Sequence, residues 1–282
     1  MALQPLLSAA TLASDLDGYR ILEAGARAVA AGTAEDLAQQ SYRQGHLPGA
    51  LFADLWAAFS DPASPWPYQR PGAERFTHAA QAVGVRAGQR VVVYDRANGI
   101  WAARLWWLFQ AYGHTAVQVL DGGLDAWCAA GLPLEQGEES AAPGDWVTSA
   151  ERPGYFVGRD EVLAVVNGQR PGQLLNVLRR PVFTGEELRY TRRGHIPGSQ
   201  HMPHGALIDP GSHQLLPVAA LQARFAALNP GTPIITYCGS GITAAGTALA
   251  LAVAGWHNVA VYDGSMAEWT ADPGLPLTTL GG

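Results

Sequence analysis

An internal repeat is the feature of this chain that most limits what it can fold into. The segment GHLPGA at 45–50 returns at 194–199 as GHIPGS, a spacing of 149 residues. Four further pairs follow in the same order, at spacings of 142 or 143 residues. They are the apolar runs 91–94 and 234–237, the Ala-Ala pairs 102–103 and 244–245, the turns 119–123 and 261–265, and the GLPL segments 131–134 and 274–277. The sequence therefore predicts two copies of one domain.

We expect the two domains at 1–137 and 151–282, joined by a linker at 138–150 in a stretch rich in Gly, Pro, Ser and acidic residues. Short apolar runs alternate with helical stretches in each half. In the second half, strands are expected at 174–175, 234–237 and 259–262, and helices at 218–228 and 243–254. Such alternation predicts an α/β fold, in which each domain is a mainly parallel sheet with helices on both faces.

Composition excludes several classes of function. The net charge of −6 offers no basic field for nucleic acid or an anionic membrane. All 18 cationic residues are Arg, which rules out a Schiff-base lysine. Two cysteines are too few for a disulfide scaffold or a zinc cluster. The first 20 residues do not resemble a signal peptide, and no long apolar run is present, so we expect a cytoplasmic protein. We also expect no cofactor.

Cys238 is the candidate nucleophile. It directly follows the strand expected at 234–237, and the segment GSGIT at 239–243 leads into an Ala-rich helix. Parallel sheets place their ligand sites at this end of the strands. Glycines let the loop turn its N–H groups inward, and the positive end of a helix stabilises a thiolate. Cys128 follows Trp127 inside a helical stretch and is interpreted as inert.

The Cys238 loop resembles the six-residue active-site loop of 3-mercaptopyruvate sulfurtransferases, and the paired Gly-His-x-Pro-Gly segments resemble tandem rhodanese domains. The resemblance covers nearly the whole chain. It implies a sulfurtransferase that carries sulfur from 3-mercaptopyruvate to a thiol or cyanide as a persulfide on an accessible Cys238, in a cleft between the domains, and releases pyruvate. The substrate-binding loop would be Gly239, Ser240, Gly241, Ile242 and Thr243, with hydroxyl donors from Ser240 and Thr243. Asp95 occupies the matching position of the first half and cannot accept sulfur.

The sequence departs from that family at the residues that would bind the substrate. The family's Asp-x-Arg reads Asn-Val-Leu at 176–178, so the Arg expected at Leu178 is missing. Arg179 and Arg180 lie next to it and are predicted to hold the substrate carboxylate, with strand alternation deciding which one points inward. Tyr68 stands where the family has a His implicated in proton transfer.

Three alternatives remain open. A phosphatase of this architecture needs Cys-x5-Arg, and the sixth residue after Cys238 is Ala244. A thiosulfate sulfurtransferase usually has basic residues in the loop, and this loop has none. A catalytically weak sulfur-binding or sensor module would fit the missing Arg and His.

The positions of the histidines in the sequence do not indicate a metal site. His201, His204 and His213 have no acidic or cysteine partner at ligand spacing, and His46 and His195 are interpreted as turn and packing residues. The expected partners are a small-molecule sulfur donor and a thiol or cyanide acceptor.

Overall fold

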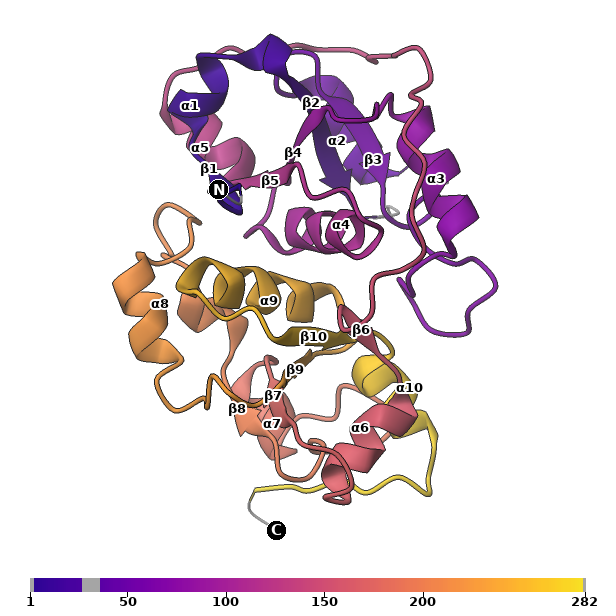
Figure 1. Ribbon diagram of the computed structural model, residues 1–282. Helices are drawn as coiled ribbons and strands as arrows, with labels where there is room; N and C mark the ends of the chain where they lie inside the picture. The colour runs from indigo at the N-terminus through magenta and orange to yellow at the C-terminus, as the bar shows by residue number, and fades with distance from the viewer. Residues whose placement is uncertain (1–2, 27–35, 281–282) are drawn as a thin grey trace. The chain divides into compact units, whose positions relative to one another are not determined.

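A computed structural model describes residues 3–26 and 36–280. The chain forms two compact units, each described here by itself. The first unit comprises Met1–Pro62, Arg70–Arg152 and Pro210–Gln214, and the second comprises Ala63–Gln69, Pro153–Asp209 and Leu215–Gly282. Figure 1 shows the first unit in indigo to magenta and most of the second in orange to yellow.

The first unit is built on a five-stranded sheet in the order β1-β5-β4-β2-β3, in which every pair is parallel. Its strands are β1 (Leu6–Leu7), β2 (Tyr19–Gly25), β3 (Leu51–Asp54), β4 (Arg90–Tyr94) and β5 (Val117–Leu120). Its helices are α1 (Ala9–Ala13), α2 (Leu37–Gln44), α3 (Ala73–Ala82), α4 (Ile100–Ala111) and α5 (Gly123–Ala129), with a 3-10 turn η1 at Leu16–Gly18.

The second unit repeats this sheet in the order β6-β10-β9-β7-β8, again with parallel pairs throughout. Its strands are β6 (Phe156–Val157), β7 (Gln173–Asn176), β8 (Gln200–His201), β9 (Ile234–Tyr237) and β10 (Val259–Tyr262). Its helices are α6 (Arg159–Val166), α7 (Arg180–Thr184), α8 (Val218–Arg224), α9 (Ile242–Ala254) and α10 (Ser265–Ala271), with a 3-10 turn η2 at His204–Leu207.

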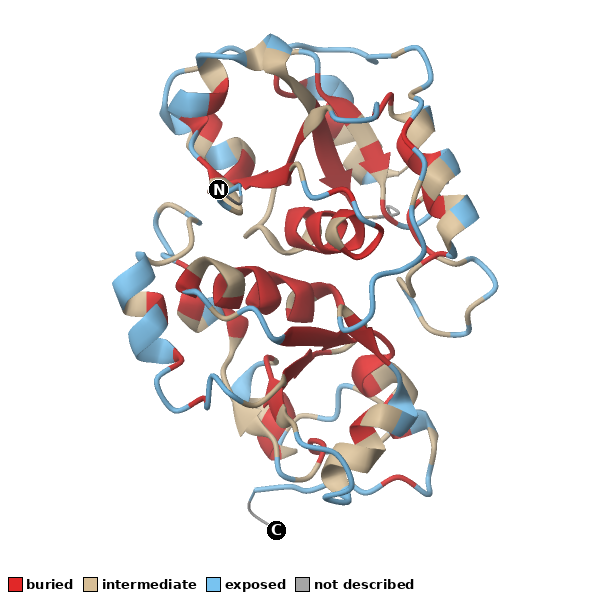
Figure 2. Ribbon diagram, viewed as in Figure 1, coloured by how far each residue is buried: buried red, intermediate tan, exposed pale blue. Residues whose placement is uncertain are grey.

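The strand orders confirm the predicted duplication, because β4 and β9 occupy the same central place in their sheets. All four residues of β9 are buried, as are the last four of β4, so both faces of each sheet are covered. Helices α4 and α9 pack on these strands and are buried over most of their circumference (Figure 2). The α/β fold class is therefore confirmed.

One predicted detail differs in the structure. Helix α8 ends at Arg224 rather than at 228 and is followed by turns. The residues predicted to form the linker at 138–150 pack on the first unit. Gly144 donates to the carbonyl of Gln81, and the Trp146 ring packs edge-on against Phe76. In the described part of the chain, no helix is long and apolar enough to cross a membrane.

Candidate active site

Cys238 follows the last residue of β9, and a short loop carries the chain from it into α9. Gly241 is the N-cap of α9 and has a φ of 76°, a left-handed conformation that favours glycine. The loop thus reverses direction within three residues, as the sequence predicts. Cys238 is only 2% exposed, so the expectation of an accessible sulfur is wrong. Gly239, Ser240 and Thr243 around it are half-buried.

Ser265 organises the base of this loop from the start of α10. Its Oγ accepts hydrogen bonds from the N–H groups of Cys238, at 3.1 Å, and Gly241, at 3.2 Å, and donates to the Tyr262 carbonyl at 2.7 Å. Ser265 is fully buried and has a φ of 49°, a conformation that is costly for a residue with a Cβ. The hydroxyl therefore holds together the two ends of the loop at the cost of local backbone strain.

The first unit shows what the same helix start does with a carboxylate. Asp95 is 1% exposed, and its two oxygens accept N–H bonds of 2.9–3.1 Å from Ala97, Gly99, Trp101 and Ala102. Burial raises the pKa of Asp95, and these four N–H groups oppose the shift. This backbone is therefore shaped to surround a single acceptor at the end of the central strand.

Counted from the N-caps Gly99 and Gly241, the amides that bind one Asp95 oxygen correspond to those of Thr243 and Ala244. Neither of these two N–H groups has an acceptor among the residues that the structure describes. The hydroxyls of Ser240 and Thr243 also have no hydrogen-bond partner among these described residues. Thr243 therefore does not cap α9, whose N-cap is Gly241. These donors are free to bind an anion at Cys238.

Tyr190 is a site residue that the sequence did not reveal. A Cβ added to Gly239 would lie 2.2 Å from the Tyr190 Oη, so the phenol lies directly against the loop and would have to shift to admit a larger residue at 239. Burial, followed by the negative charge of Cys238, raises the pKa of Tyr190 to about 12. The neighbouring charges of Arg189 and Arg179 oppose this shift. Tyr190 therefore keeps its proton at neutral pH and can donate it in a hydrogen bond beside Cys238.

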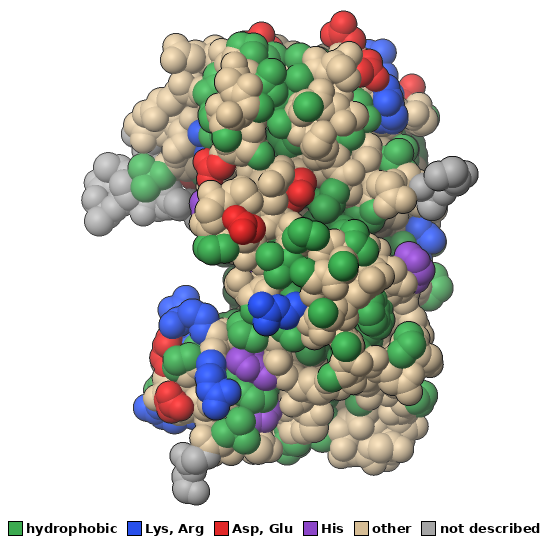
Figure 3. All heavy atoms as spheres, turned by 90° about the vertical axis from the view of Figure 1, so that its left-hand side faces the viewer, with side chains coloured by type: hydrophobic (Ala, Val, Ile, Leu, Met, Phe, Trp, Pro, Cys, Tyr) green, Lys and Arg blue, Asp and Glu red, His purple; other side chains and the backbone are tan. Residues whose placement is uncertain are grey.

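The predicted substrate arginines lie beyond the end of β7, so strand alternation does not orient them as expected. Arg179 is the N-cap of α7 and Arg180 is its first residue. Arg179 Nη2 donates to both carboxylate oxygens of Glu187 at 2.9 Å, and the Arg179 side chain is 69% exposed. Arg180 and Arg189 are exposed. Arginine side chains and carboxylates gather in the lower part of Figure 3, where the second unit is drawn.

Other candidates have structural roles. Arg192 donates to the carbonyls of Thr270, Leu275, Trp269 and Asp272, which ties down the C-terminal end of α10. His195 uses Nδ1 to bond the Phe183 carbonyl at 2.7 Å, as expected of a packing residue. Contrary to the sequence-based view, His213 does have an acidic partner, Asp125, at 2.7 Å.

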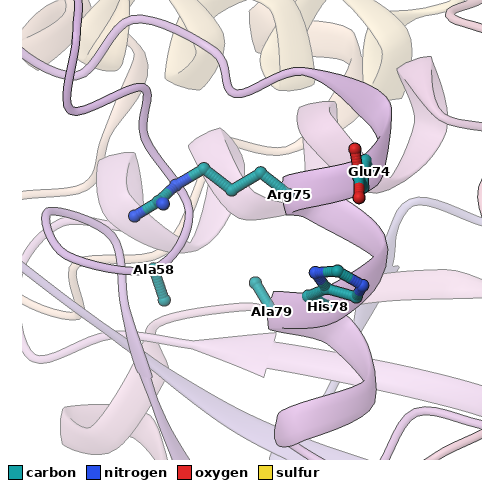
Figure 4. Close-up of a pocket in the computed structure, with 5 residues that line it drawn as sticks. All are labelled: Ala58, Glu74, Arg75, His78 and Ala79. Atoms are coloured by element: carbon teal, nitrogen blue, oxygen red, sulfur yellow. The ribbon is translucent and has the colours of Figure 1, made fainter.

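A pocket of about 410 Å³ in the first unit has no cysteine among the residues that line it. It is lined by Ala58, Glu74, Arg75, His78 and Ala79. Figure 4 shows Arg75 extending over the loop that carries Ala58, where it donates to the carbonyls of Ser60 and Ala57. The cation is thus used to hold a loop.

A family model for the rhodanese-like domain matches this chain twice, at 33–130 and at 180–272. The chain belongs to the rhodanese family. A 3-mercaptopyruvate sulfurtransferase of Escherichia coli O157:H7 is 35% identical over 274 residues, which cover 95% of this chain and 96% of that protein. A probable 3-mercaptopyruvate sulfurtransferase of Pseudomonas aeruginosa is 39% identical over 249 residues, covering 84% and 86%.

The similarity extends to solved rhodanese structures. The crystal structure of the Escherichia coli 3-mercaptopyruvate sulfotransferase SseA matches with a TM-score of 0.81 at 33% identity, covering 93% of this chain and 99% of that one. The Tum1 protein of Saccharomyces cerevisiae matches with a TM-score of 0.86 at 26% identity over the full length of both chains. Together with the named relatives, these matches make this rhodanese an enzyme of the sulfurtransferase class.

Replacing Ser265 tests its part in positioning the loop of this rhodanese. Ser265→Ala leaves the Cys238 and Gly241 amides buried without their acceptor, which should destabilise the second unit by about 1–3 kcal/mol. Ser265→Gly loses the same bonds but relieves the strain, so it should be more stable than Ser265→Ala by about 1 kcal/mol. Urea unfolding measures both values. Equal stability of the two variants would mean that the positive φ at residue 265 carries no strain energy.

Proposed function

We propose that this rhodanese moves sulfur from 3-mercaptopyruvate to a thiol or cyanide acceptor through a persulfide on Cys238, and releases pyruvate. The observation that carries the proposal is the helix start at Cys238. Its Thr243 and Ala244 amides have no acceptor among residues 3–26 and 36–280, whereas the equivalent amides of the first unit bind the Asp95 carboxylate. A persulfide anion on Cys238 would accept hydrogen bonds from amides equivalent to those that bind Asp95 in the first unit.

The reaction begins with attack of the Cys238 thiolate on the sulfur of 3-mercaptopyruvate. A sulfur–sulfur bond forms, the carbon–sulfur bond breaks, and its electron pair stays on carbon as the enolate of pyruvate. Transfer of the persulfide proton to the enolate carbon gives pyruvate and leaves the persulfide as an anion. An acceptor thiolate or cyanide then takes the outer sulfur and regenerates the Cys238 thiolate, so atoms and charge balance over the cycle.

Tyr190 supplies a neutral donor to this reaction. Its phenol lies against Gly239, and its pKa of about 12 keeps it protonated at neutral pH. A hydrogen bond from the phenol stabilises negative charge on the sulfur or on the developing enolate without adding a formal charge to a buried site. In this proposal Tyr190 is the polar group that stabilises negative charge beside Cys238.

A cation must meet the carboxylate of the donor, because a buried anion without a partner is costly. Arg179 and Arg180 were the candidates by sequence, and Arg189 joins them because it adjoins Tyr190 and influences its pKa. Arg179 would have to exchange its bond with Glu187 for the substrate. Arg189 has no ion pair within the described residues, and its side chain hydrogen-bonds Tyr190.

Thiosulfate is the second candidate donor. Leu178 removes the Arg expected to hold the carboxylate of 3-mercaptopyruvate, although a thiosulfate dianion would need a cation as well. A relative in Arabidopsis thaliana, 34% identical over 267 residues, is named thiosulfate/3-mercaptopyruvate sulfurtransferase 2. Thiocyanate release measured with both donors in parallel separates these activities from a binding module, which would release none.

Cys238→Ser should lower thiocyanate release by at least about three orders of magnitude, because the covalent carrier is lost. After exposure to donor, mass spectrometry of the unsubstituted protein should find one added sulfur on Cys238, about 32 Da. Cys128→Ser is the matched control, since it removes the other thiol and should keep full turnover. Added sulfur on Cys128 alone would contradict the assignment of the nucleophile.

Tyr190→Phe should lower kcat by roughly ten- to a hundredfold, the value of one hydrogen bond to a charged group. Since the phenol titrates near pH 12, its contribution should be constant from pH 6 to 9 and be lost only as the pH rises toward 12. The ratio of the wild-type and variant rates across that range measures this. A ratio that changes near neutral pH would show that Tyr190 acts as a titrating base instead.

Neutralising the arginine that holds the donor should raise KM more than it lowers kcat, as expected when ground-state binding is lost. We expect Arg189→Gln to raise KM for 3-mercaptopyruvate by about tenfold, the usual weight of one charge-assisted hydrogen bond. Arg179→Gln and Arg180→Gln, measured alongside, show whether either shares that role. If none of the three variants changes KM, the carboxylate is bound elsewhere and 3-mercaptopyruvate loses its support as donor.

A further inference from the structure

His46 in the first unit is a buried histidine with one unused nitrogen. The side chain is fully buried and its ring stacks on Tyr42, with centroids 4.2 Å apart. Nδ1 lies 2.9 Å from the Tyr42 carbonyl, which can only accept a hydrogen bond, so Nδ1 carries the proton. Nε2 is buried with no hydrogen-bond partner among the described residues, and it is the nitrogen left to bind a ligand. A carbonyl that fixes the tautomer in this way is the usual support of a metal-binding imidazole.

Two carboxylates lie beside that ring. One ligand atom each of His46, Glu135 and Glu139 all lie within 4.8 Å of one another. His46 and Glu135 form an antiparallel bridge through two backbone bonds of 2.9 Å, which places their side chains on the same face. Glu139 is held nearby because its N–H donates to the Tyr42 hydroxyl at 3.4 Å.

Neighbouring arginines do not neutralise these carboxylates. Arg43 pairs with Glu138 at 2.6 Å, and Arg96 pairs with Glu23 at 2.6 Å. Within the described ranges, Glu135 and Glu139 have no ion pair, although Glu135 accepts the Gly49 N–H at 2.8 Å. Among the described residues, two carboxylates without an ion-pair partner therefore lie beside the imidazole of His46.

The internal repeat provides a comparison within the same chain. His195 has the same bond from Nδ1, to the Phe183 carbonyl, and the same antiparallel bridge, to Thr278. Thr278 takes the place of Glu135 and brings no carboxylate. The histidine is thus a shared structural element of both units, whereas the acidic groups are particular to the first.

We propose that His46 Nε2 and the carboxylates of Glu135 and Glu139 bind one divalent transition-metal cation of the Zn²⁺ type. One imidazole and two carboxylates suit such an ion, with water completing its coordination. Ligand distances of about 2.1 Å require the three donor atoms to approach to roughly 3.4 Å, a shift that the two exposed glutamates can make by rotation. The ion would tie residues 135–139 to the His-x-Pro-Gly turn and stabilise the first unit, independently of the chemistry at Cys238.

Zn²⁺ titration by calorimetry of the full chain tests this inference. Cys128→Ser/Cys238→Ser serves as the background, because it removes both thiols that could bind zinc themselves. One equivalent of Zn²⁺ should bind and raise the melting temperature. Glu135→Thr, which copies the residue of the second unit and should therefore fold, and Glu139→Gln should each weaken binding by at least about tenfold.

Glu138→Gln is the matched control, since it removes an adjacent carboxylate that belongs to the Arg43 pair and should leave zinc affinity within about threefold. Absence of zinc binding to the background protein would overturn the proposal. So would an equal loss of affinity in Glu138→Gln, which would indicate diffuse attraction by acidic residues. Thiocyanate release by Glu135→Thr with both cysteines present should remain unchanged, so failure of the zinc site and failure of the sulfurtransferase function are distinguishable.

Discussion

The backbone N–H groups at the start of the helix after each central strand are the constraint on which both units depend. Burial of these groups demands an acceptor at one point in space. In the first unit, Asp95 supplies a permanent, unreactive one with four bonds. In the second unit the equivalent residue is Cys238, the proposed carrier of the transferred sulfur. One backbone arrangement thus surrounds a carboxylate in one copy and the proposed nucleophile in the other.

The differences between the copies are concentrated around that point. Where the first unit has Arg96, paired with the buried Glu23, the second has Gly239, and the space beside it is occupied by Tyr190. Gly123 of the first unit corresponds to Ser265. A Cβ on Gly123 would lie 2.4 Å from the Asp95 carbonyl, so that unit has no room for the serine. At this point the first unit has the Arg96–Glu23 ion pair, whereas the second has the neutral hydroxyls of Tyr190 and Ser265. Any negative charge here in the second unit would therefore be carried by Cys238.

Sequence alone predicted the duplication, the parallel sheets and the Cys238 loop, because each depends on patterns that lie close together along the chain. It missed Tyr190 and Arg189, which come from a segment without helix or strand, about fifty residues before the cysteine. It expected strand alternation to orient Arg179 and Arg180, but β7 ends at Asn176 and the alternation of a strand does not apply beyond it. The pairing of His46 with Glu135 depends on a bridge between residues 89 positions apart, which no local pattern reveals.

The burial of Cys238 is compatible with a carrier that must meet two small molecules. A thiolate buried away from water stays ionised only if hydrogen-bond donors replace the lost solvation, and in the proposed reaction the α9 amides and Tyr190 would supply them. A persulfide extends the side chain by a sulfur–sulfur bond of about 2.05 Å. The outer sulfur would then lie farther from the buried Cys238 and closer to the half-buried Ser240 and Thr243. The atom to be transferred would thus be the accessible one, while the sulfur that must be regenerated stays protected.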